Sequence, residues 1–406
     1  MTTHSLAFRS IVKQAGYRIG LFTYRDIKEK ISYDTKCELV NLIREFCLSR
    51  FTTFEAFSDD QSLPALYLPL ANRYLTAMQE GRIDCTHEFY LKLFHIYLAE
   101  GHLEFDPFDF IMIDEAGDLN EVTLEIFKLL PSSLKIAVGD PYQNIYTFNH
   151  TINCFQALKG QGKLFHMSTS FRVNHRIASS IQTFCRATLN PDMNFIGVDT
   201  DDEITSRAFI TRTNAALIDK MIELNAEQVP YGLARKAKEI FKLPILLASL
   251  KYQHFVTDPS YKHLQQHFDE WHEDPTLQHN HSSPLSYLAS LFRDDAQLVY
   301  SVRLIAKHKK AGIFAAYTEA ANHERYDHNL MLLTSHSSKG LEFDEVTIDS
   351  GLNEMVAKTV TQVQQGQLDT ESVPYRDAMN LYYVACSRAK KRLVNANMLT
   401  AIPNLV

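Results

Sequence analysis

The stretch FDFIMIDEAGDLNEVTLEIFKLLPSSLKIAVGDPYQNIYTF, from Phe108 to Phe148, decides the fold of this chain. Phe108–Ile113 is a nearly continuous apolar run, which predicts a strand buried on both faces of a parallel sheet. Leu119–Leu130 carries apolar residues at helical spacing and ends at Pro131. A second apolar run, Leu134–Val138, leads into a Gly-Asp pair. This succession of strand, helix and strand indicates a βαβ unit of an α/β fold.

Two carboxylates, Asp114 and Glu115, follow the first strand directly. Open α/β sheets bind their ligands at the carboxyl ends of the strands. In nucleoside triphosphate hydrolysis an aspartate at this place holds Mg²⁺, and the next carboxylate orients or deprotonates the attacking water. Gln143, just past the second strand, is placed to sense the same water or the γ-phosphate. An ordinary βαβ unit with acidic strand ends explains the first strand equally well.

The two strand ends together carry a family resemblance. Asp-Glu-Ala-Gly-Asp and Gly-Asp-Pro-Tyr-Gln-Asn-Ile-Tyr-Thr-Phe resemble the Walker B motif and the following motif of UvrD/Rep-type superfamily 1 helicases, usually close to DEAQD and GDxxQxIYxF. Gly117 stands where the family commonly has glutamine, and Asn149 where it commonly has arginine. The resemblance implies Mg²⁺ at Asp114, catalytic roles for Glu115 and Gln143, and DNA contacts by Tyr146 and Phe148.

Composition indicates an ordinary globular protein. The length of 406 residues predicts two or three domains, and 45% hydrophobic with 22% charged residues is typical of folded chains. No apolar run approaches the roughly 20 residues of a membrane helix, and no secretory signal begins the sequence. Six cysteines without CxxC or metal-ligand spacing predict a reduced, cytoplasmic compartment. A net charge of −7 neither indicates nor excludes nucleic-acid binding, because local fields matter more than the sum.

Two further segments resemble family motifs of the same helicases. Thr2-Thr3-His4-Ser5-Leu6-Ala7 resembles a T-x-H-S-x-A segment, which implies that Thr3 and His4 contact the DNA backbone. Ser170-Phe171-Arg172 resembles a YRS-type motif, which implies that Phe171 stacks on adenine and Arg172 reaches the γ-phosphate. An arginine suits that place because its fork makes bidentate, charge-assisted bonds. A surface arginine beside a strand remains the alternative.

The C-terminal quarter carries two more motifs. The sequence from Thr334 to Asp344, TSHSSKGLEFD, looks like the family's TxHxSKGLEFDxV motif, which links nucleotide to DNA. It implies DNA contacts by Thr334, His336 and Lys339 and a nucleotide contact by Glu342. The sequence NLYYVACSRAK resembles the final YVAxTRA motif, and its Arg388 is implied to be an arginine finger on the nucleotide.

The matches, in family order over nearly the whole chain, imply two RecA-like α/β domains with parallel sheets, each carrying a helical insertion, and a nucleotide cleft between them. Residues 1–9 and 103–165 are expected to form the first domain, truncated at its N-terminus, with 10–102 as its insertion. Residues 166–225 and 311–406 are expected to form the second, with 226–310 as its insertion. The small insertions resemble the F-box DNA helicase branch more than the large repair helicases.

The resemblance implies an ATP-dependent, 3′-to-5′ DNA helicase or translocase that uses ATP and Mg²⁺. Its DNA partner would be a single strand, or a duplex with a single-stranded tail. No GxxxxGK[ST] loop occurs in the sequence, so the Walker A segment is expected to be missing from this chain. That absence favours an alternative, an ATPase-inactive nucleic-acid-binding or regulatory remnant. A complementing N-terminal fragment or partner protein would reconcile it with the intact catalytic residues.

Overall fold

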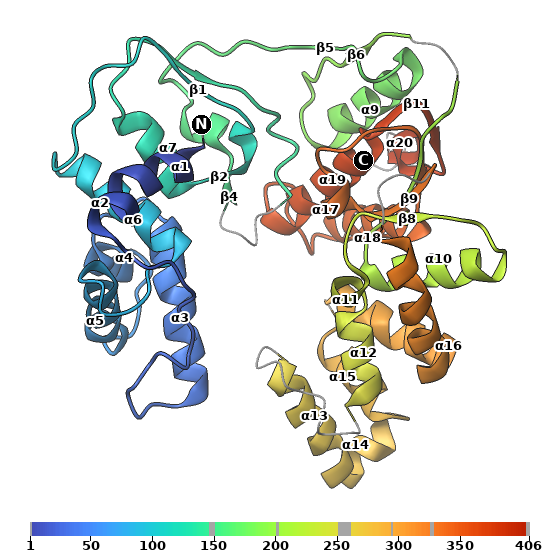
Figure 1. The fold of residues 1–406 in the computed structure, drawn as a ribbon. Coiled ribbons are helices and arrows are strands. Elements are labelled where there is room, and N and C mark those ends of the chain that lie inside the picture. The colour runs from blue at the N-terminus through green and yellow to red at the C-terminus, as the bar shows by residue number, and fades with distance from the viewer. Residues whose placement is uncertain are drawn as a thin grey trace. The chain divides into compact units, whose positions relative to one another are not determined.

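The computed structural model describes residues 2–145, 151–199, 203–250, 261–293, 295–324 and 329–402. It divides into two compact units, Met1–Leu164 (unit 1) and Phe165–Val406 (unit 2), each of which is described by itself (Figure 1). None of the helices in the described ranges is long and apolar enough to cross a membrane. All six cysteines are free thiols.

Unit 1 begins with helices. They are α1 (Thr3–Ala7), a π-helical segment (Phe8–Val12), α2 (Lys13–Ala15), α3 (Tyr33–Leu48), α4 (Phe54–Asp60), α5 (Tyr67–Gln79) and α6 (His87–Ala99). Polar side chains cap α3, α4 and α6: Ser32, Thr53 and Thr86 each accept a backbone N–H of the first turn. These caps explain why the helices begin where they do.

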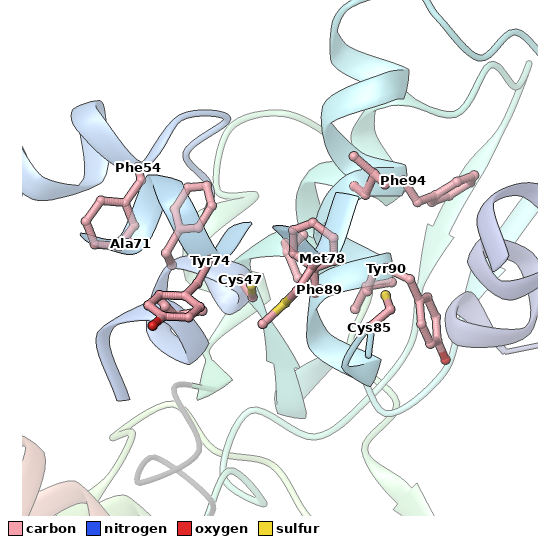
Figure 2. Close-up of a cluster of buried hydrophobic side chains, with 14 of the residues drawn as sticks. Cys47, Phe54, Ala71, Tyr74, Met78, Cys85, Phe89, Tyr90 and Phe94 are labelled. Atoms are coloured by element: carbon pink, nitrogen blue, oxygen red, sulfur yellow. The ribbon is translucent and has the colours of Figure 1, made fainter. Parts of the chain in front are cut away.

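One apolar core holds unit 1 together. Figure 2 shows part of this core, where Phe54, Tyr74, Met78, Phe89 and Phe94 project from α4, α5 and α6. The same cluster continues into α7 (Glu121–Leu129) of the α/β segment, through buried apolar residues of that helix. The early helices and the candidate catalytic strands are therefore parts of one packed body.

The α/β segment of unit 1 is built on two short parallel strands. β1 (Ile111–Ile113) pairs with β3 (Lys135–Ala137). A 3₁₀ turn (Ala116–Asp118), β2 (Leu119–Asn120) and α7 lie between them; β2 pairs with β4 (Thr151–Ile152), and α8 (Cys154–Ala157) follows. The predicted strands and helix are present, each shorter than its apolar run.

The prediction that Phe108–Ile113 is buried on both faces is wrong. One face of the β1–β3 pair packs on the cores formed with α6 and α7, where Ile111, Ile113 and Ala137 are half-buried. The other face exposes Phe110 (61%) and Met112 (58%). On β3 and its flanks, Leu134 and Val138 are also exposed. A strand that is covered on both faces has a continuous apolar sequence. The described helices cover one face of the β1–β3 pair.

Unit 2 contains a parallel sheet of five strands in the order β11-β10-β7-β9-β8. The strands are β7 (Arg207–Thr211), β8 (Gly232–Leu233), β9 (Leu330–Thr334), β10 (Phe343–Ile348) and β11 (Ala389–Val394). The helices that contact one or more of these strands are α9 (His175–Thr188), α10 (Asn214–Ala226), α17 (Ser335–Ser338), α18 (Ser350–Gln364) and α19 (Val373–Cys386). α20 (Met398–Ala401) packs on α9 and α18, and β5 (Thr169–Ser170) pairs with β6 (Ile196–Gly197). The predicted α/β class with parallel strands is confirmed.

A helical segment interrupts the chain between β8 and β9. It comprises α11 (Ala237–Ile240), α12 (Lys242–Ser249), α13 (Lys262–Glu273), α14 (Pro275–Asn280), α15 (Pro284–Leu291) and α16 (Ala296–Ala320), followed by a 3₁₀ turn (Ala321–His323). The polar stretch 274–283 contains α14. Asp274 caps that helix and Pro275 occupies its first turn, which explains how so polar a stretch becomes helical.

Candidate functional site

The first candidate group lies at the carboxyl end of β1. The Asp114 Oδ1 atom accepts the backbone N–H of Glu115 at 2.9 Å. Glu115 has φ 53°, in the left-handed region that residues other than glycine seldom adopt. Both side chains are exposed. A non-glycine residue in this conformation costs about 1–3 kcal/mol and is characteristic of functional sites.

Two glycines let the ends of β1 and β3 approach each other. A Cβ atom added at Gly117 would lie 2.5 Å from the carbonyl oxygen of Asp140. One added at Gly139 would lie 2.7 Å from the backbone nitrogen of Ala116. In this structure the backbone contact leaves no room for a side chain at position 117.

Asp140, at the end of β3, orients Gln143. Its Oδ2 atom accepts the Gln143 side-chain amide at 3.0 Å, and its Oδ1 atom accepts the backbone N–H of Tyr142 at 2.9 Å. Parallel pairing of β1 and β3 brings Asp114, Glu115 and Gln143 to the same edge of the pair. Sequence reasoning missed the role of Asp140, although its place after the second apolar run was the available signal.

The second candidate group is in unit 2. Phe171 is 80% exposed, and the Arg172 Nε atom lies 2.5 Å from the Glu342 Oε2 atom. Both partners of this ion pair are about half exposed, so it contributes at most about 1 kcal/mol to stability. The structure thus brings together residues that the sequence predicted, separately, to contact the nucleotide.

Arg388 is buried, with 1% of its surface exposed. Its guanidinium donates to the carbonyl oxygens of Val384 (3.0 Å) and Leu341 (3.4 Å) and to the Ser387 hydroxyl (2.9 Å). The backbone N–H of Phe343 donates to the Arg388 carbonyl at 2.9 Å. Arg388 is therefore held against the segment that also carries Glu342.

The predicted DNA contacts lie in several places. Thr334 ends β9 and caps α17: its hydroxyl accepts the Ser337 N–H at 3.3 Å, which fixes the short helix carrying His336. Lys339, just beyond α17, is half-buried. Thr3 and His4 lie in α1, where the His4 ring meets Tyr90 edge-on at 5.9 Å. Tyr146 and Phe148 lie outside the described residues.

The Asp114 carboxylate fits Mg²⁺ as one ligand of several. Within the described part of the chain, no group of three or more His, Cys, Asp or Glu side chains could hold a metal ion. Mg²⁺ is commonly held by one or two carboxylates together with substrate phosphates and water. An exposed Asp114, followed by a second exposed carboxylate, matches that mode and does not match an all-protein cage.

Comparison with known proteins shows that this chain is similar to helicases. The model of the UvrD-like helicase C-terminal domain matches residues 3–398. The F-box DNA helicase protein 1 of Schizosaccharomyces pombe is 24% identical over 336 residues, which cover 77% of this chain and 36% of that protein. The F-box DNA helicase 1 of Gallus gallus is 23% identical over 341 residues, covering 79% of this chain and 32% of that protein. The chain spans about a third of the length of these curated relatives.

Proposed function

The chain belongs to the UvrD-like helicases, and on that premise we propose that it is an ATP-dependent, 3′-to-5′ DNA translocase or helicase of the F-box DNA helicase branch. The resemblance seen in the motifs is confirmed. Activity, polarity and substrate are parts of the proposal, as is the division of each unit into a RecA-like part and a helical insertion. The observation that carries it is the grouping of Asp114, Glu115 and Gln143 at one strand edge.

Unit 1 supplies the hydrolytic residues in this proposal. Asp114 would hold Mg²⁺, which supplies charge neutralisation to the phosphates when bound. Glu115, exposed at a left-handed turn, would orient the attacking water and accept its proton. Gln143, oriented by Asp140, would contact the same water or the γ-phosphate.

Unit 2 supplies residues that bind the nucleotide. The exposed Phe171 ring would stack on adenine. Arg172 would direct its fork to the γ-phosphate, with Glu342 holding the guanidinium in place at 2.5 Å. Arg388 would stabilise the charge that spreads over the transferred phosphoryl group.

Single-stranded DNA, or a duplex with a single-stranded tail, is the proposed polymer substrate. Such strands are held by contacts to phosphates and by stacking on aromatic rings. The residues proposed to make these contacts are Thr3, His4, Tyr146, Phe148, Thr334, His336 and Lys339.

A complementing segment with a phosphate-binding loop belongs to the same proposal. Residues 1–406 contain no GxxxxGK[ST] sequence, whose backbone N–H groups, lysine and hydroxyl would otherwise hold the phosphates and Mg²⁺. The exposed apolar face around Phe110 and Met112 supports this part, because parallel strands are normally covered on both faces. The segment would come from the same polypeptide or from a partner protein.

DNA-stimulated ATP hydrolysis tests the function. The 406-residue chain is compared with a version extended by whatever its reading frame encodes upstream, or supplied with a complementing fragment. We expect poor turnover by the 406-residue chain and robust turnover by the completed form. In the completed form Glu115→Gln should lower the rate by about 10²–10⁴-fold, since it removes the base and keeps the shape. Nucleotide binding should persist.

Glu104→Gln is the control, since Glu104 is an exposed carboxylate of unit 1 outside the site. Robust turnover by the 406-residue chain that Glu115→Gln abolishes would disprove the need for a complementing segment. Undiminished turnover in the Glu115→Gln variant would disprove the role of Glu115.

Residues 1–406, which contain no GxxxxGK[ST] sequence, also fit a second function, an ATPase-inactive module that binds nucleic acid or regulates a helicase. It predicts DNA binding by the 406-residue chain and no ATP turnover in any completed form. The same assay therefore decides between the two functions.

A further inference from the structure

Asp344 is a buried carboxylate to which no step of the proposed reaction has assigned a role. It lies near the start of β10 and is 3% exposed. Its Oδ2 atom accepts the backbone N–H and hydroxyl of Thr205, at 2.9 and 2.7 Å, and those of Ser206, at 3.0 and 3.1 Å. Its own N–H donates to the Ser206 hydroxyl at 2.9 Å. Asp344 thus ties β10 to the segment that leads into β7.

A bulge joins the same carboxylate to β11. Phe343 is paired with Ala389 and Glu345 with Arg392, so two residues of β11 lie opposite Asp344 alone. These residues are Lys390 and Lys391, whose ammonium groups lie 3.2 and 3.7 Å from the Asp344 Oδ1 atom. One carboxylate therefore binds both residues of β11 that lie opposite it in the bulge.

The charge state of Asp344 matches this arrangement. Burial by itself would raise the pKa of the carboxyl group. The hydrogen bonds from Thr205, Ser206 and Lys390 outweigh burial and hold the pKa well below its usual range. Asp344 is therefore an anion at physiological pH, and a buried anion requires the partners that surround it.

The neighbours of Asp344 hold both arginines proposed to contact phosphate. Glu342 pairs with Arg172, and Leu341 accepts a hydrogen bond from the Arg388 guanidinium. The backbone N–H of Phe343 bonds the Arg388 carbonyl, immediately before the bulge. Asp344 lies one, two and three positions from Phe343, Glu342 and Leu341, the residues that make these contacts.

We propose that Asp344 is a positioning residue that holds the β10–β11 bulge and thereby places Arg388 and the Arg172–Glu342 pair. Its effect on catalysis rests on the proposed function, whereas its effect on the placement of the arginines does not. Glu345 provides a matched comparison. It is also buried in β10, and its carboxylate pairs with Arg207 and with Arg392, four residues beyond Arg388.

Chemical modification of arginine tests the placement in the intact 406-residue chain. Phenylglyoxal reacts with accessible guanidinium groups, and mass spectrometry of peptides measures the rate at each arginine. We expect slow reaction of Arg388 in the unaltered chain. Asp344→Asn should raise the rate at Arg388 by about tenfold or more, because it removes the anion that anchors the bulge. Glu345→Gln should raise the rates at Arg207 and Arg392 and leave Arg388 slow.

An unchanged Arg388 rate in folded Asp344→Asn protein would overturn the proposal, and so would an equal rise in both variants. If Asp344→Asn does not fold, Lys390→Met removes one partner of the carboxylate and should raise the Arg388 rate to a smaller extent. No rise in that variant would overturn the proposal equally.

ATP turnover by the completed protein gives a second readout. Asp344→Asn should lower kcat and leave KM nearly unchanged, while Glu345→Gln should leave both unchanged, although both variants lose a buried ion pair. Equal losses of kcat in the two variants would reduce Asp344 to a general stabilising residue. If the unaltered protein hydrolyses no ATP, the proposed function fails and the modification experiment still decides the placement.

Discussion

Lys92 buries an ammonium group inside unit 1. Its Nζ atom donates to the carbonyl oxygens of Ser49 and Phe51, at 2.6 and 2.8 Å, and lies 4.8 Å from the centre of the Phe46 ring. Desolvation lowers the pKa of Lys92 from 10.5 to about 8. The lysine links α6 to the end of α3. Because its pKa is lowered in the folded chain, its contribution to the free energy of unfolding depends on pH.

Lys92 should make the stability of the chain rise in alkaline solution. Between pH 8 and 10.5 the unfolded chain still binds the proton and the folded chain does not, so the free energy of unfolding increases with pH. Relative to Lys92→Met, the unaltered chain should gain roughly 3 kcal/mol across this window. Urea denaturation of both proteins at several pH values measures the difference. A constant difference from pH 7 to 11 would contradict the lowered pKa.

Arg388 should act on the transition state. In the completed protein, Arg388→Ala should lower kcat by about 10³–10⁵-fold with little change in nucleotide affinity. Because the side chain is buried and bonded to two carbonyl groups, the melting temperature of each variant must be measured beside its kinetics. Arg388→Lys keeps the positive charge and loses the bidentate guanidinium, so kcat of this variant should also be low. A collapse of nucleotide affinity with normal kcat would contradict the arginine-finger role.

At the scale of elements, the β1–β3 pair differs most from what its sequence predicted. The apolar run Phe108–Ile113 predicted a strand buried on both faces, and the structure covers one face of the pair with α6 and α7. The exposed face carries Phe110, Met112, Leu134 and Val138. Contiguous exposed apolar surface of this kind marks an interaction site or a tendency to associate.

Polar substitutions on this face should reduce association of the chain and leave its free energy of unfolding nearly unchanged. Met112→Ser with Leu134→Ser should reduce self-association of the 406-residue chain, since each side chain is more than half exposed. For the same reason each substitution should change the free energy of unfolding by only about 0.5 kcal/mol. Light scattering and urea denaturation measure the two effects. Leu21→Ser, at an 83% exposed residue of another segment, is the control and should not reduce association. A large loss of stability would show that the face is packed.

At the scale of the whole molecule, the proposed binding to DNA would depend on local charge, because the net charge is −7. Neutralising phosphates with Lys and Arg releases counterions, so affinity for a single strand should fall steeply between about 50 and 200 mM salt. Fluorescence anisotropy with a labelled single strand and with a blunt duplex measures this. The single strand should bind more tightly. Equal affinity for both, or an affinity that does not change with salt, would count against the proposed translocation on single-stranded DNA.

The sequence by itself determined the class of fold, the family and the order of the motifs. Apolar runs, helical spacing and caps such as Ser32 and Thr86 act over a few residues, so they can be read along the chain. The placement of Gln143 one strand away from Asp114 also follows from the sequence, because adjacent parallel strands end at the same edge.

Only the tertiary structure decided the contacts between segments distant in sequence. Gly117 faces Asp140, and Asp344 meets Thr205 and Lys390, because the backbones approach closely and a bulge sets two residues against one. Neither contact can be predicted from the residues that neighbour it in the sequence. Burial of Arg388 and exposure of Met112 likewise depend on what packs against each residue, and packing is a property of the folded chain that no stretch of sequence contains.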